Sequence, residues 1–370
     1  MRVLLVSNYL ADRQESMLRF AAALQSGLTA AGIDVQVVRP EPVFGKLRSG
    51  GRGLGKWLGY LDKFCLFPRR LRQFARRADL VHIVDHSNAM YVPCVARGPH
   101  LVTCNDLLAI RSAHGEFPEN RTGWTGRILQ KWILSGLRQA RRLTCISEAT
   151  RKDVLRYTAH SPEAVTVTFM GQNFAYAPVK TILEAAEARR RGEARGLLEE
   201  PYILHVGGTS WYKNRPGVLA IHAALRNSLG AKAPRLILVG PPLDEPISGV
   251  EARQGVENAD LAALYSGAEL LLFPSLAEGF GWPIIEAQAC GCRVLTTGKP
   301  PMTEVGGDAA FYLENPTDAE AGAERVMEIL MQDQDARRRT REAGIANAGR
   351  FSSDHMIEEY VKIYREVLTT

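Results

Sequence analysis

The sequence predicts an α/β protein made of two doubly wound domains. Strand-like and helix-like segments alternate along the chain, and the whole alternation occurs twice. Repeated β-then-α order indicates a parallel sheet covered by helices on both faces. At 370 residues the chain is also longer than one hydrophobic core usually supports. We therefore expect a first domain over residues 1–178, a second over 179–352, and a final helical segment over 353–370.

Ten segments carry the strand pattern and three longer segments carry the helix pattern. The strands expected in the first half are Arg2–Ser7, Asp34–Val38, Leu80–Val84, Leu101–Cys104, Arg142–Ile146 and Val165–Phe169. Those expected in the second half are Tyr202–Val206, Arg235–Val239, Glu269–Phe273 and Arg293–Thr296. Helical spacing occurs at Met17–Ala31, Gly126–Ala140 and Ser353–Leu368. The charged, Ala-rich segment Thr181–Glu200 predicts a surface helix or a linker between the domains.

Composition favours a cytoplasmic globular protein. Hydrophobic residues make up 46% of the chain and charged residues 23%, as in ordinary globular domains. The six cysteines show no C-x-x-C spacing, so we expect reduced and mostly buried thiols. The opening MRVLLVSN has too short an apolar run for a signal peptide, and no apolar run reaches the roughly 18 residues of a membrane span. We expect neither export nor a transmembrane helix.

Positive charge is concentrated in the first half of the chain. Residues 1–175 contain 25 Lys or Arg against 13 Asp or Glu, whereas the remaining residues contain 21 against 27. Ten of these cations lie in Lys46–Arg77, among several aromatic and leucine residues, and a second basic, Trp-bearing stretch is Arg121–Arg142. Cations beside Trp and Leu suit an anionic membrane surface, and they equally suit a solvated helix face that packs its apolar side on the core. No nucleic-acid motif accompanies the charge, so nucleic acid is not an expected partner.

A pair of glutamates marks the most informative segment, PSLAEGFGWPIIE at residues 274–286. Glu278 and Glu286 bracket a glycine-containing turn that leads into a helix whose first residue is expected to be Pro283. The free N–H groups at a helix start bind a diphosphate, and the two carboxylates can accept hydrogen bonds from sugar hydroxyls on either side of it. The spacing alone is also compatible with two solvated glutamates at a strand-to-helix corner.

A second motif, VGGTSWYKNRP at residues 206–216, follows another expected strand. Gly207 and Gly208 permit close approach of the backbone to a ligand. Lys213 and Arg215 supply cations for a departing nucleotide diphosphate, because cleavage of a sugar–phosphate bond builds negative charge on the leaving oxygen. A solvated basic loop is the alternative interpretation of the same residues.

Together with GCRVLT at 291–296 and TEVGGD at 303–308, these motifs resemble the donor-site signature of the retaining glycosyltransferases of family 4. The resemblance is strong from Pro201 to Asp308 and looser before it. It implies the GT-B fold, with two Rossmann-like domains facing a central cleft in which transfer occurs, and a C-terminal helix that crosses back to the first domain. It also implies a donor site made of Gly207, Gly208, Lys213, Arg215, Glu278, Gly279, Phe280, Gly281 and Glu286.

Within that site the resemblance assigns specific contacts. It implies that Glu278 contacts the transferred sugar, that Glu286 contacts the nucleotide ribose, and that Lys213 is the cation at the phosphates. The backbone N–H groups of Phe280 and Gly281 are implied to meet the phosphates directly.

The chain departs from the family pattern at three places. Gly208 stands where many members have an arginine, and Asn105 stands where many have a histidine that faces the sugar. Asparagine can donate a hydrogen bond but cannot carry charge or shuttle a proton. The loop after the first strand lacks the usual glycine pair, and Arg13 is its only cation. His86, Asp106 and Arg13 are therefore the other acceptor-side candidates, although His86 equally fits a satisfied loop histidine.

The sequence thus predicts a retaining, metal-independent hexosyltransferase that needs no cofactor. Its expected donor is a nucleotide-diphosphate sugar and its expected acceptor a lipid-linked or polysaccharide glycan of the cell surface, with the enzyme peripheral to the inner face of a membrane. Neither half shows G-x-G-x-x-G between strand and helix, which argues against a dehydrogenase. The Lys213 motif disfavours a glycoside hydrolase, whose paired carboxylates need no phosphate site. A catalytically weak sugar-nucleotide-binding protein remains the alternative because of Asn105 and Gly208.

Overall fold

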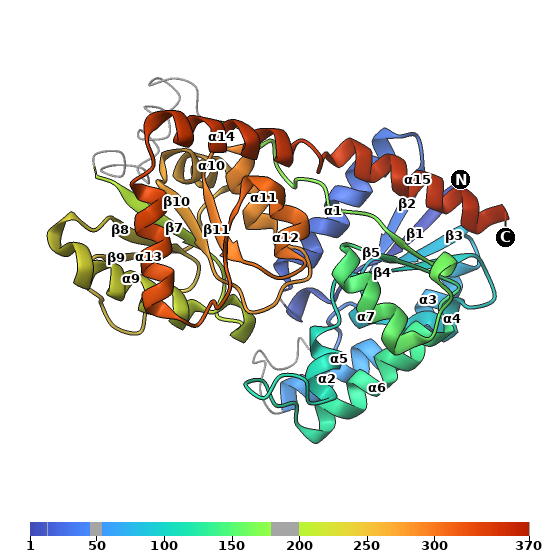
Figure 1. The fold of residues 1–370 in the computed structure, drawn as a ribbon. Coiled ribbons are helices and arrows are strands. Elements are labelled where there is room, and N and C mark those ends of the chain that lie inside the picture. Colours follow the sequence, from blue (N-terminus) through green and yellow to red (C-terminus); the bar gives the residue numbers. More distant parts are fainter. Residues whose placement is uncertain (13, 45–53, 179–199, 370) are drawn as a thin grey trace. The chain divides into compact units, whose positions relative to one another are not determined.

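A computed structural model describes residues 1–12, 14–44, 54–178 and 200–369, and of residues 54–57 it describes the backbone alone. The chain divides into two compact units, each of which makes most of its residue contacts within itself (Figure 1). Unit 1 comprises Met1–Asn173 and Ser353–Thr370, and unit 2 comprises Phe174–Ser352. Most of the predicted linker Thr181–Glu200 lies outside the described residues.

Unit 1 is a six-stranded parallel sheet with the strand order β2-β1-β3-β4-β5-β6. Its strands are β1 (Arg2–Val6), β2 (Asp34–Val38), β3 (Leu80–Ile83), β4 (His100–Cys104), β5 (Arg142–Cys145) and β6 (Val165–Val167). Its helices are α1 (Glu15–Ala30), α2 (Leu54–Leu61), α3 (Phe67–Ala75), α4 (Val92–Val95), α5 (Leu108–Ala113), α6 (Trp124–Gln139), α7 (Glu148–Thr158) and α15 (Ser353–Thr369). A π-helix, Asp62–Leu66, joins α2 to α3.

Helix α15 packs on unit 1 although the whole of unit 2 separates it from the rest of that unit in sequence. It lies against α1 and the sheet (Figure 1). Tyr364 Oη lies 2.7 Å from Nδ1 of the buried His82, and Tyr360 Oη lies 3.1 Å from Oγ1 of Thr103. Both tyrosines are fully buried, so the aromatic face of α15 forms part of the unit 1 core.

Unit 2 is a second six-stranded parallel sheet, with the order β12-β11-β10-β7-β8-β9. Its strands are β7 (Tyr202–Val206), β8 (Arg235–Val239), β9 (Val250–Arg253), β10 (Leu270–Phe273), β11 (Val294–Thr297) and β12 (Phe311–Leu313). Its helices are α9 (Arg215–Leu229), α10 (Asn258–Gly267), α11 (Trp282–Ala289), α12 (Met302–Gly306), α13 (Ala319–Leu330) and α14 (Gln334–Ala348).

The prediction of two doubly wound α/β sheets is confirmed, and all ten predicted strands are present with ends shifted by no more than two residues. The sequence pattern did not predict two strands, β9 and β12. The four residues of β9 are all partly exposed and include Glu251 and Arg253, so they lack the apolar run that identified the inner strands. The cysteines are free thiols, and four of the six are buried.

Candidate functional site

The loops that carry the donor motifs leave the unit 2 sheet at its topological switch point. Strands β7 and β10 are neighbours in the sheet. The strands that follow β7 in sequence, β8 and β9, lie on one side of this pair, and those that follow β10, β11 and β12, lie on the other. Doubly wound sheets bind ligands at the carboxyl ends of the two strands that flank such a point. The loop after β7 contains the Gly207–Arg215 motif, and the loop after β10 contains Glu278.

Lys213 and Glu278 form an ion pair between these two loops. Lys213 Nζ lies 2.8 Å from Glu278 Oε1, and only 18% of the lysine side chain and 6% of the glutamate side chain are exposed. The ammonium also lies 5.1 Å from the ring centre of Phe273, the last residue of β10. A cation held by a carboxylate and an aromatic face is oriented before any ligand arrives.

Asn214 fixes the geometry of the loop that follows β7 and contains Lys213, which we call the lysine loop. Its backbone is left-handed, with φ of 52°, and its side chain accepts a hydrogen bond of 3.2 Å from Gly217 N as the cap of α9. Its amide nitrogen donates to the carbonyl oxygens of Pro274 and Pro316, at 2.9 and 2.8 Å. Asn214 therefore ties the lysine loop to the loop that carries Glu278. The sequence motifs did not single it out, although an asparagine two residues before a proline at a helix start is a recognised capping signal.

The two glycines of the motif differ in what surrounds them. A Cβ on Gly207 would lie 3.0 Å from His205 Nε2 and 3.6 Å from Lys213 Cδ, so a side chain there would press on the lysine stem. A Cβ on Gly208 would meet no atom of the described chain within 4 Å. The position where many family members have an arginine is therefore open in this protein.

Arg215 is buried at the start of α9 and has unused hydrogen-bonding capacity. Its Nη2 donates to the carbonyl oxygen of Pro242 at 3.3 Å, whereas its buried Nη1 has no partner among the described residues. A buried cationic N–H without an acceptor costs free energy, of the order of 1–3 kcal/mol. An anionic ligand would remove that cost.

The buried histidine beneath the lysine loop is a group that the sequence motifs did not reveal. His205 Nδ1 lies 2.9 Å from the carbonyl oxygen of Leu272, and Nε2 has no partner among the described residues. Burial, together with the charges of Lys213 and Arg215, lowers the pKa of His205 to about 4. The imidazole is therefore neutral at pH 7 and adds no positive charge to the loop.

Glu286 is placed differently from Glu278. It lies in α11, where only 5% of it is exposed, and its Oε2 accepts a hydrogen bond of 2.9 Å from Tyr265 Oη. Helix α11 begins at Trp282, so Pro283 is its second residue instead of the predicted first. Gly281, with φ of 103°, makes the left-handed turn before the helix, a conformation that a side chain would strain. Gly279 and the buried Phe280 lie in this same turn.

Two of the unit 1 candidates, Asn105 and His86, lie in a buried polar cluster at the carboxyl ends of β1, β3 and β4. Asp85 is its centre and follows β3. Asn8, which follows β1, donates to Asp85 Oδ2, and Asn105, which follows β4, donates from Nδ2 to Asp85 Oδ1 at 3.2 Å. The switch point of this sheet lies between β1 and β3, so the cluster occupies the position equivalent to that of the donor loops.

His86 brings a positive charge into this cluster. Its Nδ1 lies 3.1 Å from Asp85 Oδ1, so the two side chains form an ion pair when the imidazole is protonated. Burial lowers the pKa of His86, but the Asp85 carboxylate outweighs it and raises the pKa to about 9. Burial likewise raises the pKa of Asp85, yet His86 and the donors Ser87 and Asn8 hold it well below its usual value. The pair is charged at pH 7.

The remaining acceptor-side candidates lie outside this charge pair. Asp106 Oδ1 accepts a hydrogen bond of 2.9 Å from Leu108 N, which holds the turn that begins α5. Arg13 lies outside the described residues. Asn105 has a second contact, at 3.5 Å, to the carbonyl oxygen of Val84, whereas its own Oδ1 is buried without a partner among the described residues.

Family comparisons decide the class of protein. Residues 17–171 match the model described as "Glycosyltransferase Family 4", and residues 187–347 match the model described as "Glycosyl transferases group 1". The chain belongs to the family 4 type of glycosyltransferases. The Escherichia coli protein named "O-antigen chain mannosyltransferase B" is 24% identical over 311 residues, which cover 81% of this transferase and 78% of that protein.

Solved structures show that this transferase has the GT-B fold. Sucrose-phosphate synthase from Thermosynechococcus elongatus aligns with a TM-score of 0.75 at 18% identity, covering 100% of the transferase and 99% of that chain. Anabaena Alr3699/HepE, solved in complex with UDP and glucose, aligns with a TM-score of 0.69 at 17% identity, covering 98% and 99% of the two chains.

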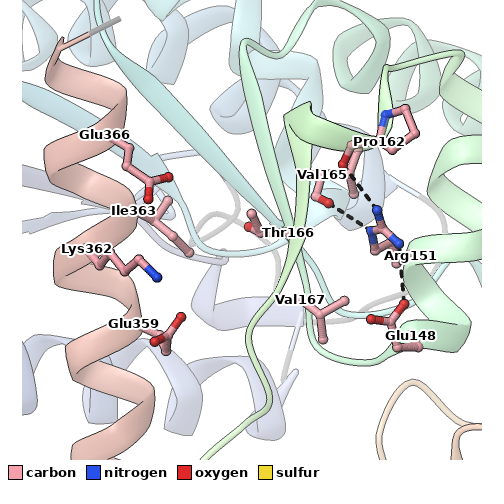
Figure 2. A pocket seen from close by; sticks show the side chains of 10 residues that line it. All are labelled: Glu148, Arg151, Pro162, Val165, Thr166, Val167, Glu359, Lys362, Ile363 and Glu366. Carbon is pink, nitrogen blue, oxygen red and sulfur yellow. Dashed lines mark hydrogen bonds and ion pairs between the residues drawn. The ribbon is translucent and has the colours of Figure 1, made fainter.

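A groove of about 480 Å³ lies in unit 1 of the transferase, between α7, β6 and α15 (Figure 2). Arg151 crosses one of its walls and donates to the carbonyl oxygens of Val165 and Pro162, at 2.9 and 3.2 Å. None of the predicted donor or acceptor residues lines this groove. The groove runs along the edge strand β6. The candidate residues of unit 1 instead lie in the loops that come after β1, β3 and β4 in the chain.

Over the described ranges, no group of three or more His, Cys, Asp or Glu side chains is arranged to hold a metal ion. In the same ranges, no helix is both long and apolar enough to cross a membrane.

Proposed function

We propose that this glycosyltransferase moves a hexosyl unit from a nucleotide-diphosphate sugar to a lipid-linked or polysaccharide acceptor, with retention of anomeric configuration. The observation that carries the proposal is the Lys213–Glu278 pair, which sets a cation 2.8 Å from a hydrogen-bond acceptor at the switch point of the unit 2 sheet. A donor that contains both a diphosphate and a hexose supplies one group for each of these side chains.

In the proposed donor complex the ammonium of Lys213 and the unpartnered Nη1 of Arg215 bind the diphosphate. Charge grows on the leaving oxygen as the sugar–phosphate bond breaks, and fixed cations there lower the barrier. Two side-chain cations balance the charge that a divalent metal would otherwise balance, so we propose that transfer needs no metal ion.

The two glutamates take separate parts of the donor in this proposal. Glu278, once the diphosphate attracts Lys213, accepts hydrogen bonds from hydroxyls of the hexose. Glu286, oriented by Tyr265 at 2.9 Å, accepts hydrogen bonds from the ribose hydroxyls. The left-handed turn at Gly281 directs backbone N–H groups at the start of α11 toward the phosphates.

On the acceptor side we propose His86 as the group that supplies positive charge in place of the missing histidine at position 105. The Asp85 carboxylate keeps the imidazole protonated, and Asn105 holds that carboxylate through Nδ2 at 3.2 Å. Asn105 is then a positioning residue in this chain. This arrangement favours an active enzyme over a catalytically weak sugar-nucleotide-binding protein, because the charge that Asn105 lacks lies on its neighbour.

The identity of donor and acceptor rests on the relatives. One is named an O-antigen chain mannosyltransferase, and HepE was solved with UDP and glucose. A nucleotide-activated hexose, with a mannosyl donor tested first, and a growing cell-surface glycan are therefore the proposed substrates. A lipid-linked acceptor would lie in a membrane, so the proposal places the enzyme in the cytoplasm at the inner face of a membrane.

A thermal-shift screen with GDP-mannose, UDP-glucose and ADP-glucose tests the donor class. A ligand that binds the folded state raises the apparent melting temperature as its concentration exceeds the dissociation constant. We expect one nucleotide sugar to stabilise the enzyme and the variant Glu286→Ala to lose most of that shift. A matched variant in the same unit, Glu328→Ala, removes an exposed carboxylate of α13 and should keep it. Absence of any shift with these donors and with free GDP and UDP would contradict the proposal.

A further inference from the structure

The outer face of helix α6 exposes apolar side chains that the core does not use. Its inner face buries Ile133, Leu134 and Leu137 against the rest of unit 1. On the outer face Trp124, Ile128 and Trp132 are 75%, 59% and 43% exposed, respectively. These three residues are spaced by four and therefore form one row along the helix. Leaving two tryptophans and an isoleucine in water is costly, so a row of this kind indicates a contact surface.

This row, which we call the α6 apolar row, continues onto a second segment of unit 1. The ring of Trp132 contacts that of Phe64 in the π-helix, with a centroid distance of 4.9 Å. Leu61 and Leu66, on either side of Phe64, are exposed. The predicted basic stretch Lys46–Arg77 is therefore divided, because Phe67 and Leu71 pack in the core, whereas Leu61 and Leu66 extend the exposed face. Residues 46–53 of that stretch lie outside the described residues.

Positive side chains flank the α6 apolar row. Arg127 and Lys131 are exposed and each follows a member of the row by three residues, which places them on the neighbouring line of the helix surface. Helix α6 contains no Asp or Glu. Helix α3 adds exposed arginines at positions 69, 70 and 72, of which Arg70 is paired with Glu41.

We infer that the α6 apolar row is a docking surface for an anionic bilayer, with the row entering the headgroup region and the flanking cations facing lipid phosphates. Tryptophan and basic residues on one helix suit this interface. A second copy of the chain fits poorly, because a twofold contact through α6 would set like charges against each other. The inference extends the proposed function, since it names the surface on which a lipid-linked acceptor would be met. Vesicle binding needs neither donor nor transfer, so the two proposals can fail separately.

Flotation of the full-length enzyme with vesicles tests the inference. We expect it to float with vesicles of phosphatidylglycerol and phosphatidylcholine at low salt, to be released as salt screens the attraction, and to stay unbound with phosphatidylcholine alone. The triple variant Trp124→Ser, Ile128→Ser, Trp132→Ser should reduce the bound fraction at least tenfold. The charge variant Arg127→Gln, Lys131→Gln should lower binding at low salt and reduce its salt dependence.

A matched control removes exposed apolar side chains elsewhere. Met331 and Ile345 of unit 2 are 76% and 41% exposed, and Met331→Ser, Ile345→Ser should bind vesicles like the unchanged enzyme. Every variant is first checked for an unchanged melting temperature and an unchanged shift with the nucleotide sugar. Equal binding of the triple variant and the unchanged enzyme would overturn the inference, as would equal binding to neutral and anionic vesicles. Binding to neither vesicle, or a dimer that the triple variant dissociates, would also overturn it.

Discussion

Lys213 Nζ lies 2.8 Å from Glu278 Oε1, so an ion pair joins the loops that follow β7 and β10. Both side chains are mostly shielded from water, so water screens their attraction less than it screens that of an exposed pair. In the proposed mechanism the donor diphosphate competes with Glu278 for the lysine and leaves the carboxylate to the sugar.

Lys213→Ala should lower kcat about 100-fold and change the affinity for the nucleotide sugar much less, because the lysine acts most strongly on charge that develops during cleavage. Lys213→Arg keeps the charge and is the matched control, with most of kcat expected to remain. Steady-state release of the nucleotide diphosphate measures both parameters. Normal turnover of Lys213→Ala would remove this residue from the mechanism.

Glu286→Gln should weaken binding of the free nucleotide diphosphate about tenfold, since it removes the anionic acceptor proposed for the ribose. Glu278→Gln should not weaken that binding, because it removes the carboxylate that competes for Lys213, and it should reduce transfer, because the proposed partner of Glu278 is the hexose. Tyr265→Phe removes the hydrogen bond that orients Glu286 and should show a smaller version of the Glu286→Gln effect. Calorimetric titration with the nucleotide alone separates the two glutamates, and equal losses in both variants would show that their roles are wrongly assigned.

The single variant Gly208→Arg should fold normally. In the double variant Gly208→Arg, Arg215→Gln, the new arginine should restore the affinity for the donor that Arg215→Gln alone loses. A Cβ at position 208 meets no described atom within 4 Å, so a side chain can be added without displacing its surroundings. The new guanidinium would supply the phosphate cation that many family members carry at that position. Affinity for the nucleotide diphosphate is measured in the single and double variants. If Arg215→Gln binds as tightly as the unchanged enzyme, Arg215 has no part in donor binding.

Much of this arrangement could be predicted from sequence, because buried strands and glycine-rich loops leave local signals. The Glu278 and Lys213 motifs were identified from residue type and spacing, and the structure places them in the loops that follow the adjacent strands β7 and β10. The ion pair itself could not be predicted, since the two residues are 65 positions apart and their meeting depends on the order of strands in the sheet. The assignment of each residue to a part of the donor stays a prediction.

The unit 1 cluster was harder to predict for a related reason. Asn105 and His86 were both candidates, but Asp85 was not, because a single aspartate after a strand has no distinctive spacing. Only the parallel packing of β1, β3 and β4 brings Asn8, Asp85 and Asn105 into contact. The charge on His86 follows from that contact and not from local sequence.

His86→Gln should reduce transfer strongly while sparing nucleotide affinity, because it removes the charge proposed for the acceptor side. Asn105→His should bring no gain, since Asn105 is buried and its amide already serves Asp85. Transfer rate, nucleotide affinity and melting temperature are compared for both variants. Higher transfer by Asn105→His, combined with normal transfer by His86→Gln, would return the role to position 105 and leave His86 as a structural residue.

The most direct test of the central claim is proton NMR of donor cleavage in excess EDTA, using the nucleotide sugar selected by the thermal-shift screen and water as the acceptor. The enzyme should release the nucleotide diphosphate without added metal, and the first sugar signal should have the same anomeric configuration as the donor before mutarotation. Lys213→Ala, run in parallel, should release the diphosphate about 100-fold more slowly. An inverted first product, or cleavage that appears only when magnesium or manganese is added, would contradict this mechanism.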